Sequence, residues 1–410
     1  MKKFFALLLS LAMVLALVAC GQKDPTPDTP DTPDDPQTKV EYKVAMITDY
    51  GDITDQSFNQ TTYEACKAFA EDNSIEFSYF KPAGDNTADR VAMIEKAVDE
   101  GFNVIVMPGY AFGGAIVEAA PEFPDVKFIA LDVAAGDLLE TAVAKAGEAY
   151  DYTPENWDLN KYVDMSNVYC AVYQEELCGY MAGYAAVKLG YKNLGFLGGM
   201  SVPAVVRYGY GFVQGVDAAA ADLGLTDVKL NYIYGGQFFG DADITAVMDT
   251  WYQGGTEVVF ACGGGIYTSA VDAAKKVGAK VIGVDVDQAG VIANYAGVDG
   301  MTVTSAMKGL YPATYDTLTD VIVNGNWEKY VGKIETLGLV SGTDPEANYV
   351  QIPMGDGTQW SDSFTQDDYK AMVKDMFDGK ITVSNNTSSD VSAADFATVI
   401  TVDDQGSIKC

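Results

Sequence analysis

Side chains suited to ligand binding stand where predicted strands end and predicted helices begin. Phe58 and Asn59 place an aromatic ring and an amide side by side at the start of a predicted helix. Three predicted strands end on an acid: Asp49, Asp132 and Asp285. A carboxylate in that position can accept hydrogen bonds from the hydroxyl groups of a ligand, although aspartate in α/β folds also caps helices and starts loops. A ring for stacking, combined with an amide and carboxylates, suits a flat, neutral, polar ligand.

The sequence excludes several kinds of chemistry. The 410 residues include no histidine, which rules out Ser-His-Asp and Cys-His mechanisms and every histidine metal site. The six cysteines form no Cys-x-x-Cys pair, so neither a zinc site nor a disulfide framework is indicated, and no metal or cofactor is expected. Gly-Lys occurs only at 332–333 and 379–380 and is followed each time by Ile, so the chain has no Walker A phosphate loop.

A pair of carboxylates leaves one enzymatic alternative open. Asp285 and Asp287 are two residues apart and would share a face if the strand continued through both, as the paired acids of a glycosidase must face one substrate. Asp287 fits equally well as the start of the next loop. No nucleophile, metal site or histidine supports catalysis, so no catalytic residue is assigned and the chain is expected not to be an enzyme.

From residue 43 the chain alternates short apolar runs with amphipathic segments, which is the pattern of βαβ repetition. The predicted strands are 43–49, 75–81, 103–107, 127–132, 167–173, 193–198, 228–234, 257–262 and 280–285. The predicted helices are 57–72, 86–100, 112–122, 174–189, 203–224, 241–253 and 266–277. This repetition predicts an α/β fold of mostly parallel sheets with helices on both faces. So many strands favour two lobes over one open sheet, and ligands bind such sheets beyond the carboxyl ends of the strands.

Three local predictions follow from the same pattern. Ser57 is predicted to cap the first helix, because a serine oxygen there can accept a hydrogen bond from a free backbone N–H. Gly179 and Gly183 give the helix over 174–189 a smooth face for close packing. The polar stretch 136–166 is predicted to be irregular and to lead into the first crossing between the lobes.

The first 20 residues have the form of an export signal that ends in a lipid attachment site. Two lysines precede an almost wholly apolar run over 4–19, which is short for a membrane span. The run ends in Leu-Val-Ala-Cys, which resembles the lipobox of bacterial lipoproteins with Cys20 as the lipidated residue; the alternative is an ordinary secretion signal. Residues 21–42 are rich in Pro, Thr and Asp and are predicted to be a disordered tether. We therefore expect an extracytoplasmic protein of the bacterial cell envelope, anchored to the cell membrane through Cys20.

The formal net charge of the chain is −32. Such a surface repels nucleic acid and anionic lipid headgroups, so no nucleic-acid partner is expected. It places little restriction on a small neutral ligand held by local contacts.

Several motifs occur together in an order typical of one family of transport proteins. The matching stretches are Asp-Gln-Ser-Phe-Asn-Gln at 55–60, then 124–128, 174–176, 179–183, 198–200 with Pro203, 207–212, Gly-Val-Asp-Val-Asp-Gln at 283–288, and 304–308. Over roughly residues 43–325 the chain resembles the basic membrane protein family of ABC-transporter substrate-binding lipoproteins, whose characterised members bind purine nucleosides. Ser-Phe-Asn-Gln with Gly-Val-Asp-x-Asp-Gln is a fairly specific pair of motifs. The similarity fades after about residue 341, except at 369–383, and the segment 136–166 is longer than the family pattern.

The resemblance implies a two-lobed type I periplasmic-binding-protein-like fold, each lobe a mostly parallel sheet flanked by helices. Residues 43–173 and 304–328 would form the N-terminal lobe, and 174–303 with 329–400 the C-terminal lobe. It also implies a binding lipoprotein of an ABC importer, monomeric, that captures a nucleoside between its lobes and delivers it to a permease in the membrane.

In this family the base lies between two aromatic rings, and acids and a lysine bind the sugar and the base edges. Carried onto this sequence, Phe58 is one ring and the second lies within 235–240, where Phe238 is favoured but Phe239 differs by a single register step. Gly263 and Gly264 would let the backbone approach the ligand, and Asp285 and Lys308 would complete the set of polar side chains. The ligand-binding residues predicted in this way are Asp49, Phe58, Asn59, Asp132, Phe238, Gly263, Gly264, Asp285 and Lys308.

Other functions are compatible with the same residues. Sugars also stack on rings and bind carboxylates, so a receptor for a sugar or a small signalling molecule, with the same fold, is an alternative. A surface adhesin or antigen, with the tether as its main feature, is another, and the carboxylate-based hydrolase described above is a third.

Overall fold

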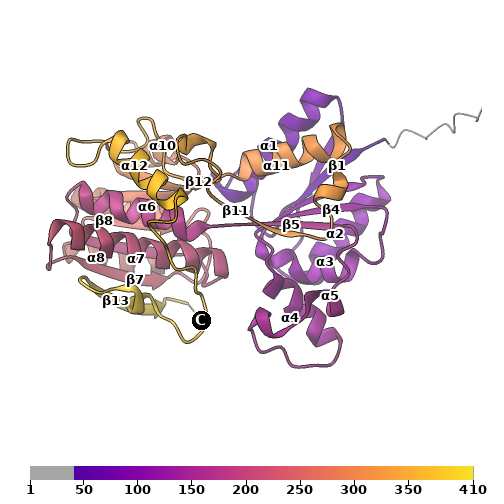
Figure 1. Ribbon diagram of the computed structural model, residues 1–410, viewed down its shortest axis with the longest axis horizontal. Helices are drawn as coiled ribbons and strands as arrows, with labels where there is room; N and C mark the ends of the chain where they lie inside the picture. Colours follow the sequence, from indigo (N-terminus) through magenta and orange to yellow (C-terminus); the bar gives the residue numbers. More distant parts are fainter. Residues whose placement is uncertain (1–40, 410) are drawn as a thin grey trace, which may run out of the picture. The chain divides into compact units, whose positions relative to one another are not determined.

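The chain folds into two sheets, each covered by helices, in the computed structural model (Figure 1), which describes residues 41–409. Cys20, the predicted lipobox and the tether as far as residue 40 lie outside the described residues. The chain from Tyr42 onward clusters into a single unit that contains both sheets, and the predicted α/β fold of two mostly parallel sheets is confirmed. Over the described residues, we find no helix with the length and apolar character to cross a bilayer.

The first sheet has the strand order β11-β5-β4-β3-β1-β2, and all its strand pairs are parallel. Its strands are β1 (Lys43–Ile47), β2 (Glu76–Phe80), β3 (Val104–Pro108), β4 (Lys127–Leu131), β5 (Val168–Tyr173) and β11 (Ile334–Leu337). Its lobe contains the helices α1 (Phe58–Asn73), α2 (Thr87–Asp99), α3 (Gly113–Ala119), α4 (Ala135–Lys145), α5 (Leu159–Tyr162) and α11 (Leu310–Leu318). Val44 and Met46 pack with α1, whereas Ala45 and Ile47 pack with α2 and α3, because successive strand residues point to opposite faces. Burial on both faces explains why these strands are continuously apolar.

The second sheet has the order β12-β10-β9-β8-β6-β7-β13, and only the short β12 is antiparallel to its neighbour. Its strands are β6 (Asn193–Gly198), β7 (Lys229–Tyr234), β8 (Val258–Cys262), β9 (Lys280–Asp285), β10 (Thr302–Lys308), β12 (Val350–Gln351) and β13 (Thr401–Ser407). The helices α6 (Glu175–Lys188), α7 (Pro203–Leu223) and α12 (Gln366–Phe377) cover one face, and α8 (Ala242–Gln253), α9 (Tyr267–Val277) and α10 (Ala289–Ala296) cover the other. Short helical turns complete the chain: η1 (Tyr110–Phe112), η2 (Pro154–Asn156), η3 (Thr319–Val323), η4 (Trp327–Lys329), η5 (Pro345–Ala347) and η6 (Ala393–Phe396).

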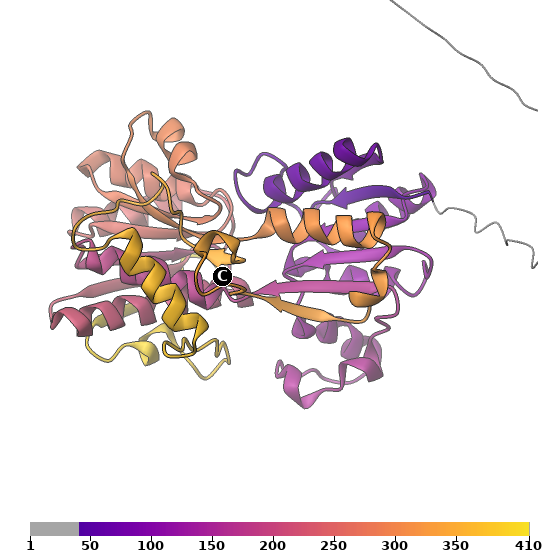
Figure 2. The same ribbon diagram turned by 45° about the horizontal axis from the view of Figure 1, so that its top comes forward.

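The chain passes between the sheets after β5, after β10 and after β11. In Figure 2 the orange α11 lies in the lobe of the first sheet, where it packs against α1. The predicted lobe boundaries differ from the sheets in two places. Residues 304–308 belong to β10 of the second sheet, and 334–337 form β11 beside β5 of the first sheet.

The predicted strands correspond to β1–β9, but the later strands were not predicted from the sequence. β11 and β13 are edge strands. β13 consists mostly of exposed polar residues, and β11 has only four residues, two of them exposed and polar, so neither has the apolar run by which the others were identified. The stretch 136–166 is also more regular than predicted, since it contains α5 and nearly all of α4.

Helices α6 and α7 cross at very short distance, and glycines on both make this possible. A Cβ added at Gly179 would overlap the carbonyl oxygen of Tyr208, and one at Gly183 would overlap that of Phe212. On the other helix, a Cβ at Gly211 would overlap the carbonyl oxygen of Glu176. The prediction of a smooth face on the helix over 174–189 is therefore confirmed.

Gly211→Ala should lower the free energy of unfolding by about 1–3 kcal/mol, because the added methyl group meets rigid backbone and forces the helices apart. Gly290→Ala in α10 is the matched control, since a Cβ there meets no atom within 4 Å and should leave stability unchanged or slightly higher. Urea unfolding of both variants measures the difference. Equal stability of the two variants would contradict the close crossing.

Glu176, in the first turn of α6, is a buried acid with an unsatisfied oxygen. Its Oε2 has no hydrogen-bond partner among the described residues. Burial raises the pKa of Glu176 to about 7, and the neighbouring Glu175 carboxylate adds to the shift. The folded protein therefore binds this proton more tightly than the unfolded chain, and stability should fall as the pH rises from about 4.5 to about 7.

Glu176→Gln should remove this part of the pH dependence. Relative to the parent, the variant should gain roughly 1–3 kcal/mol of unfolding free energy between pH 5 and pH 8, because the parent alone must bury a charge at the higher pH. Unfolding titrations at both pH values test this. Parallel pH profiles of variant and parent would show that Glu176 does not titrate in this range.

Candidate functional site

Loops at the carboxyl ends of both sheets enclose a cavity of about 410 Å³. Every ligand-binding residue predicted from the sequence lines it: Asp49, Phe58, Asn59, Asp132, Phe238, Gly263, Gly264, Asp285 and Lys308. The lining also contains residues that the sequence did not single out as ligand-binding, among them Tyr50, Tyr110, Asp137, Arg207 and Tyr208. Strand ends that are far apart in the sequence thus meet at one place, as expected for parallel sheets.

Asp49 follows β1 and is held by the backbone of the next two residues. Its Oδ1 accepts hydrogen bonds from the N–H groups of Tyr50 at 2.6 Å and Gly51 at 2.7 Å. Burial raises the pKa of Asp49, and these backbone hydrogen bonds oppose the shift. Gly51 must lack a side chain, because a Cβ there would overlap the amide of Asn59. The buried Oδ1 of Asn59 has no hydrogen-bond partner among residues 41–409.

Ser57 occupies the N-cap position of α1, as predicted, but its side chain makes no capping hydrogen bond. Its Oγ instead donates a hydrogen bond of 2.5 Å to Oδ2 of Asp285 in the other lobe. The carboxylate of Asp55 takes the capping role and accepts from the N–H groups of Ser57, Asn59 and Gln60 at 3.0, 2.9 and 3.0 Å. A hydrogen bond to a carboxylate is stronger than one between neutral groups, which explains why the Ser57 hydroxyl bonds to Asp285 and does not cap the helix.

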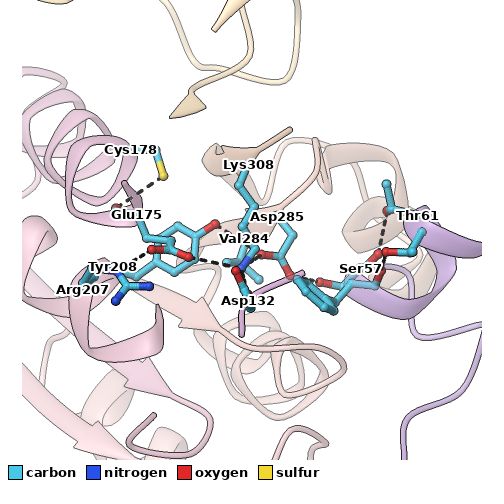
Figure 3. A network of polar contacts seen from close by, with 12 residues as sticks. Ser57, Thr61, Asp132, Glu175, Cys178, Arg207, Tyr208, Val284, Asp285 and Lys308 are labelled. Carbon is cyan, nitrogen blue, oxygen red and sulfur yellow. Dashed lines mark hydrogen bonds and ion pairs between the residues drawn. The ribbon is translucent and has the colours of Figure 1, made fainter. Parts of the chain in front are cut away.

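Lys308, at the end of β10, is the buried cation of the site (Figure 3). Its Nζ forms an ion pair with Asp132 and lies 3.5 Å from Oε1 of Glu175 and 3.8 Å from Oδ1 of Asp285. Burial opposes the charged form, but these carboxylates together raise the pKa of Lys308 above its ordinary range. The ammonium also lies 4.7 Å from the centre of the Phe58 ring, where a cation is attracted by the ring face. Lys308 thereby joins acids from both lobes.

Asp132 and Asp285 share an uncommon backbone conformation. Their φ angles are 59° and 65°, in the left-handed region that aspartate tolerates better than most residues. The conformation ends each strand and turns the side chain toward the cavity. Burial raises the pKa of Asp132, while the Lys308 ammonium opposes the shift. Oδ1 of Asp132 is likewise buried and has no hydrogen-bond partner within the described part of the chain.

An ion pair behind Lys308 was missed in the sequence. Nε of Arg207 donates to Oε2 of Glu175 at 2.6 Å, and the Glu175 side chain is fully buried. The hydroxyl of Tyr208 donates to Oδ1 of Asp285 at 3.2 Å. The available signal was an arginine near the start of α7, a helix that is otherwise mostly apolar.

The rings of Phe58 and Phe238 line the cavity from different lobes. Phe238 packs against backbone: a Cβ at Gly263 would lie 2.6 Å from its ring, and one at Gly199 would overlap it. Gly263 is therefore required by the packing of a ring, in addition to any close approach to a ligand. Phe239 also reaches the lining but is 57% exposed. The geometry favours Phe238 over Phe239 as the fixed ring, and its stacking role stays a prediction.

The pair of carboxylates expected for a glycosidase is not formed. β9 ends at Asp285, and Asp287 is exposed, is absent from the cavity lining and accepts a hydrogen bond from the N–H of Ala289 at 3.0 Å. Asp287 therefore starts the next turn, which was the other position expected for it from the sequence.

Acidic side chains outnumber basic ones around the cavity. The carboxylates are Asp49, Asp52, Asp55, Asp132, Asp137 and Asp285, and the cations are Lys81, Arg207 and Lys308. Among these acids, Asp137 has a pKa that burial raises to about 7. Because Lys308 and Arg207 are already paired with acids, the site suits a neutral or cationic polar ligand better than an anion. Among residues 41–409 no group of three or more Cys, Asp or Glu side chains is placed to hold a metal ion.

The chain is similar to known proteins over most of its length. The Lactococcus lactis ABC transporter nucleoside-binding protein BmpA is 25% identical over 392 residues, which cover 92% of this chain and 96% of that protein. An uncharacterized lipoprotein of Pyrococcus abyssi is 26% identical over 320 residues, covering 74% of this chain and 69% of its own.

The fold also has a solved counterpart. The crystal structure of an ABC transporter solute-binding protein from Aeropyrum pernix matches with a TM-score of 0.59 at 20% identity, over 84% of this chain and 88% of that one, which confirms the predicted type I binding-protein fold. The sequence model of the Bmp family, described as ABC transporter substrate-binding protein, PnrA-like, matches residues 42–343. Since that match spans both lobes and every residue predicted to line the cavity, the chain belongs to the Bmp family of PnrA-like ABC transporter substrate-binding proteins.

Proposed function

We propose that this protein captures a nucleoside, with purines preferred, in the cavity between its lobes and delivers it to an ABC permease. The observation that carries the proposal is a ring on each lobe, Phe58 and Phe238, beside unfilled acceptors on Asn59 and Asp132. Rings bind the flat base by stacking, and acceptors bind N–H and O–H groups of base and sugar. A volume of about 410 Å³ lies in the range of small-molecule sites.

The charge of the site agrees with a nucleoside and disfavours a nucleotide. A phosphate group would meet an excess of carboxylates, and the cations Arg207 and Lys308 are engaged with Glu175 and Asp132. Binding without chemistry is the expected activity, because Asp285 is held by Ser57, Tyr208 and Lys308.

Capture would proceed by closure of the lobes over the ligand. The hydrogen bond from Ser57 to Asp285 and one of 3.2 Å from Nε2 of Gln288 to the carbonyl of Gln56 join the lobes around the cavity. Such contacts can form only when the lobes approach, so they contribute to the closed state that a permease would recognise. Attachment through Cys20 at the outer face of the cell membrane would keep a monomeric binding protein near its permease.

A receptor for a sugar is the second candidate. It would use the same carboxylates, and ring stacking is common to both ligands. The rings on both lobes favour a nucleoside, since one flat base can fill the space between them.

Isothermal titration of residues 21–410 with adenosine, guanosine, inosine, cytidine and ribose tests the proposal. The protein is first unfolded and refolded to remove any ligand carried through purification. We expect micromolar or tighter binding of the purine nucleosides. Phe58→Ala and Phe238→Ala should each weaken it by about 10- to 100-fold, because base–aromatic stacking is worth ~1–3 kcal/mol.

Phe239→Ala is the matched control and should change affinity little, since that ring is largely exposed. Heat from ribose without heat from nucleosides would replace the proposal with the sugar receptor. No binding at all by a folded protein, across the whole panel, would reject both ligands.

Ser57→Ala should weaken nucleoside binding by about 10- to 100-fold, because it removes a hydrogen bond to a charged group that joins the lobes. The effect should lie mainly in faster release, measured by stopped-flow displacement. Thermal stability should hardly change, since Asp55 caps α1. Ser388→Ala removes an exposed hydroxyl in the C-terminal segment and serves as control. Unchanged release from Ser57→Ala would argue against this contact as a latch.

A further inference from the structure

The loop that carries Phe238 contacts the rest of its lobe on one side and the C-terminal strand on the other. It follows β7 and runs from Gly235 to Asp241. Its first residues are fixed by N–H groups of Gly235 and Gly236 that donate to the carbonyls of Gly198 and Gly199 at 2.7 and 2.9 Å. Near the ring, the N–H of Gly265 donates to the carbonyl of Phe238 at 2.8 Å. The next residue, Phe239, pairs with Gly265 through its backbone, and its side chain is largely exposed.

The C-terminal strand β13 lies beside this loop and contacts it. β13 pairs in parallel with β7, and Figure 1 shows it in yellow at the edge of the second sheet. The N–H of Ile408 donates to the carbonyl of Tyr234 at 2.8 Å, so the chain leaves β13 beside the start of the loop. The next residue, Lys409, lies against Gly236 of the loop: a Cβ added to Gly236 would be 2.8 Å from the Cβ of Lys409.

The side chain of Lys409 then spans the loop. Its Nζ donates to Oε1 of Gln237 at 2.9 Å and forms an ion pair with Asp241. Nε2 of Gln237 donates in turn to the carbonyl of Phe239 at 2.9 Å and to Asp241 at 3.0 Å. Asp241 is itself fixed, because it caps α8 by accepting from the N–H of Ile244 at 3.0 Å. These polar contacts connect the two ends of the loop on either side of Phe238.

We propose that Lys409 is a positioning residue, which holds the loop over 235–241 so that the Phe238 ring stands ready against the ligand. The inference rests on the proposed function for its ligand, but the ordering of the loop does not. Lys409 and β13 lie beyond residues 42–343, the part that matches the family, so this support is built from the chain's own C-terminal segment. An ion pair this exposed adds little to global stability, so its effect should be local.

The test compares Lys409→Met, which keeps the aliphatic stem, with Lys409→Arg, which keeps the charge, in a soluble chain of residues 21–410. Lys380→Met is the matched control: it removes an exposed lysine that also pairs with two aspartates, Asp375 and Asp378, but lies away from the loop. We expect Lys409→Met to weaken inosine binding by about 3- to 10-fold, Lys409→Arg to restore most of it, and Lys380→Met to change nothing.

A double-mutant cycle with Phe238→Ala identifies how Lys409 acts. If it acts through the ring, Lys409→Met should cost little further affinity once Phe238 is alanine. Equal losses in both backgrounds would overturn the proposal, because Lys409 would then act independently of the ring.

Amide hydrogen exchange of the ligand-free protein gives a readout that needs no ligand. Peptides covering 235–241 should exchange faster in Lys409→Met than in the parent or in Lys380→Met, while the core strands β6 and β8 exchange alike in all of them. Unchanged exchange in the loop would overturn the proposal even if nucleosides bind. Faster exchange in a protein that binds no nucleoside would reject the proposed ligand and leave the positioning role supported.

Discussion

A buried ammonium group organises the centre of this protein. The Lys308 side chain is 3% exposed, and removing such a charge from water is costly unless carboxylates surround it. The compensating negative charge comes from Asp132 of the first lobe and from Glu175 and Asp285 of the second. Because the acids belong to both lobes, the lobes must approach each other for Lys308 to be fully paired. The electrostatic requirement of one side chain is therefore a requirement on the arrangement of the two lobes.

The same cluster lies at the points where the chain crosses between the lobes. Glu175 begins α6 directly after the crossing from β5, and Lys308 ends β10 directly before the crossing to α11. The close glycine-mediated contact of α6 with α7 fixes Glu175 and Arg207 relative to each other.

Several other side chains at the site are left incompletely satisfied by the protein itself. Asn59 and Asp132 keep acceptors without protein partners, although buried polar atoms are usually satisfied. Phe58 and Phe238 face the cavity in place of packing fully into a core. Incomplete hydrogen bonding and half-buried rings cost stability in the unliganded state, and a polar flat molecule can supply what is missing.

The sequence alone determined the alternation of β1–β9 with their helices, because strands buried on both faces must be apolar and helices on a sheet must be amphipathic. It also pointed to nine residues now found on the cavity wall, through local motifs and a family resemblance. Only the tertiary structure decided that Ser57 bonds to Asp285, that Arg207 and Glu175 support Lys308, and that β11 and β13 complete the sheets. Those features depend on partners 30 to more than 200 residues apart in the chain, or on edge strands with polar sequences, and local patterns carry no record of either.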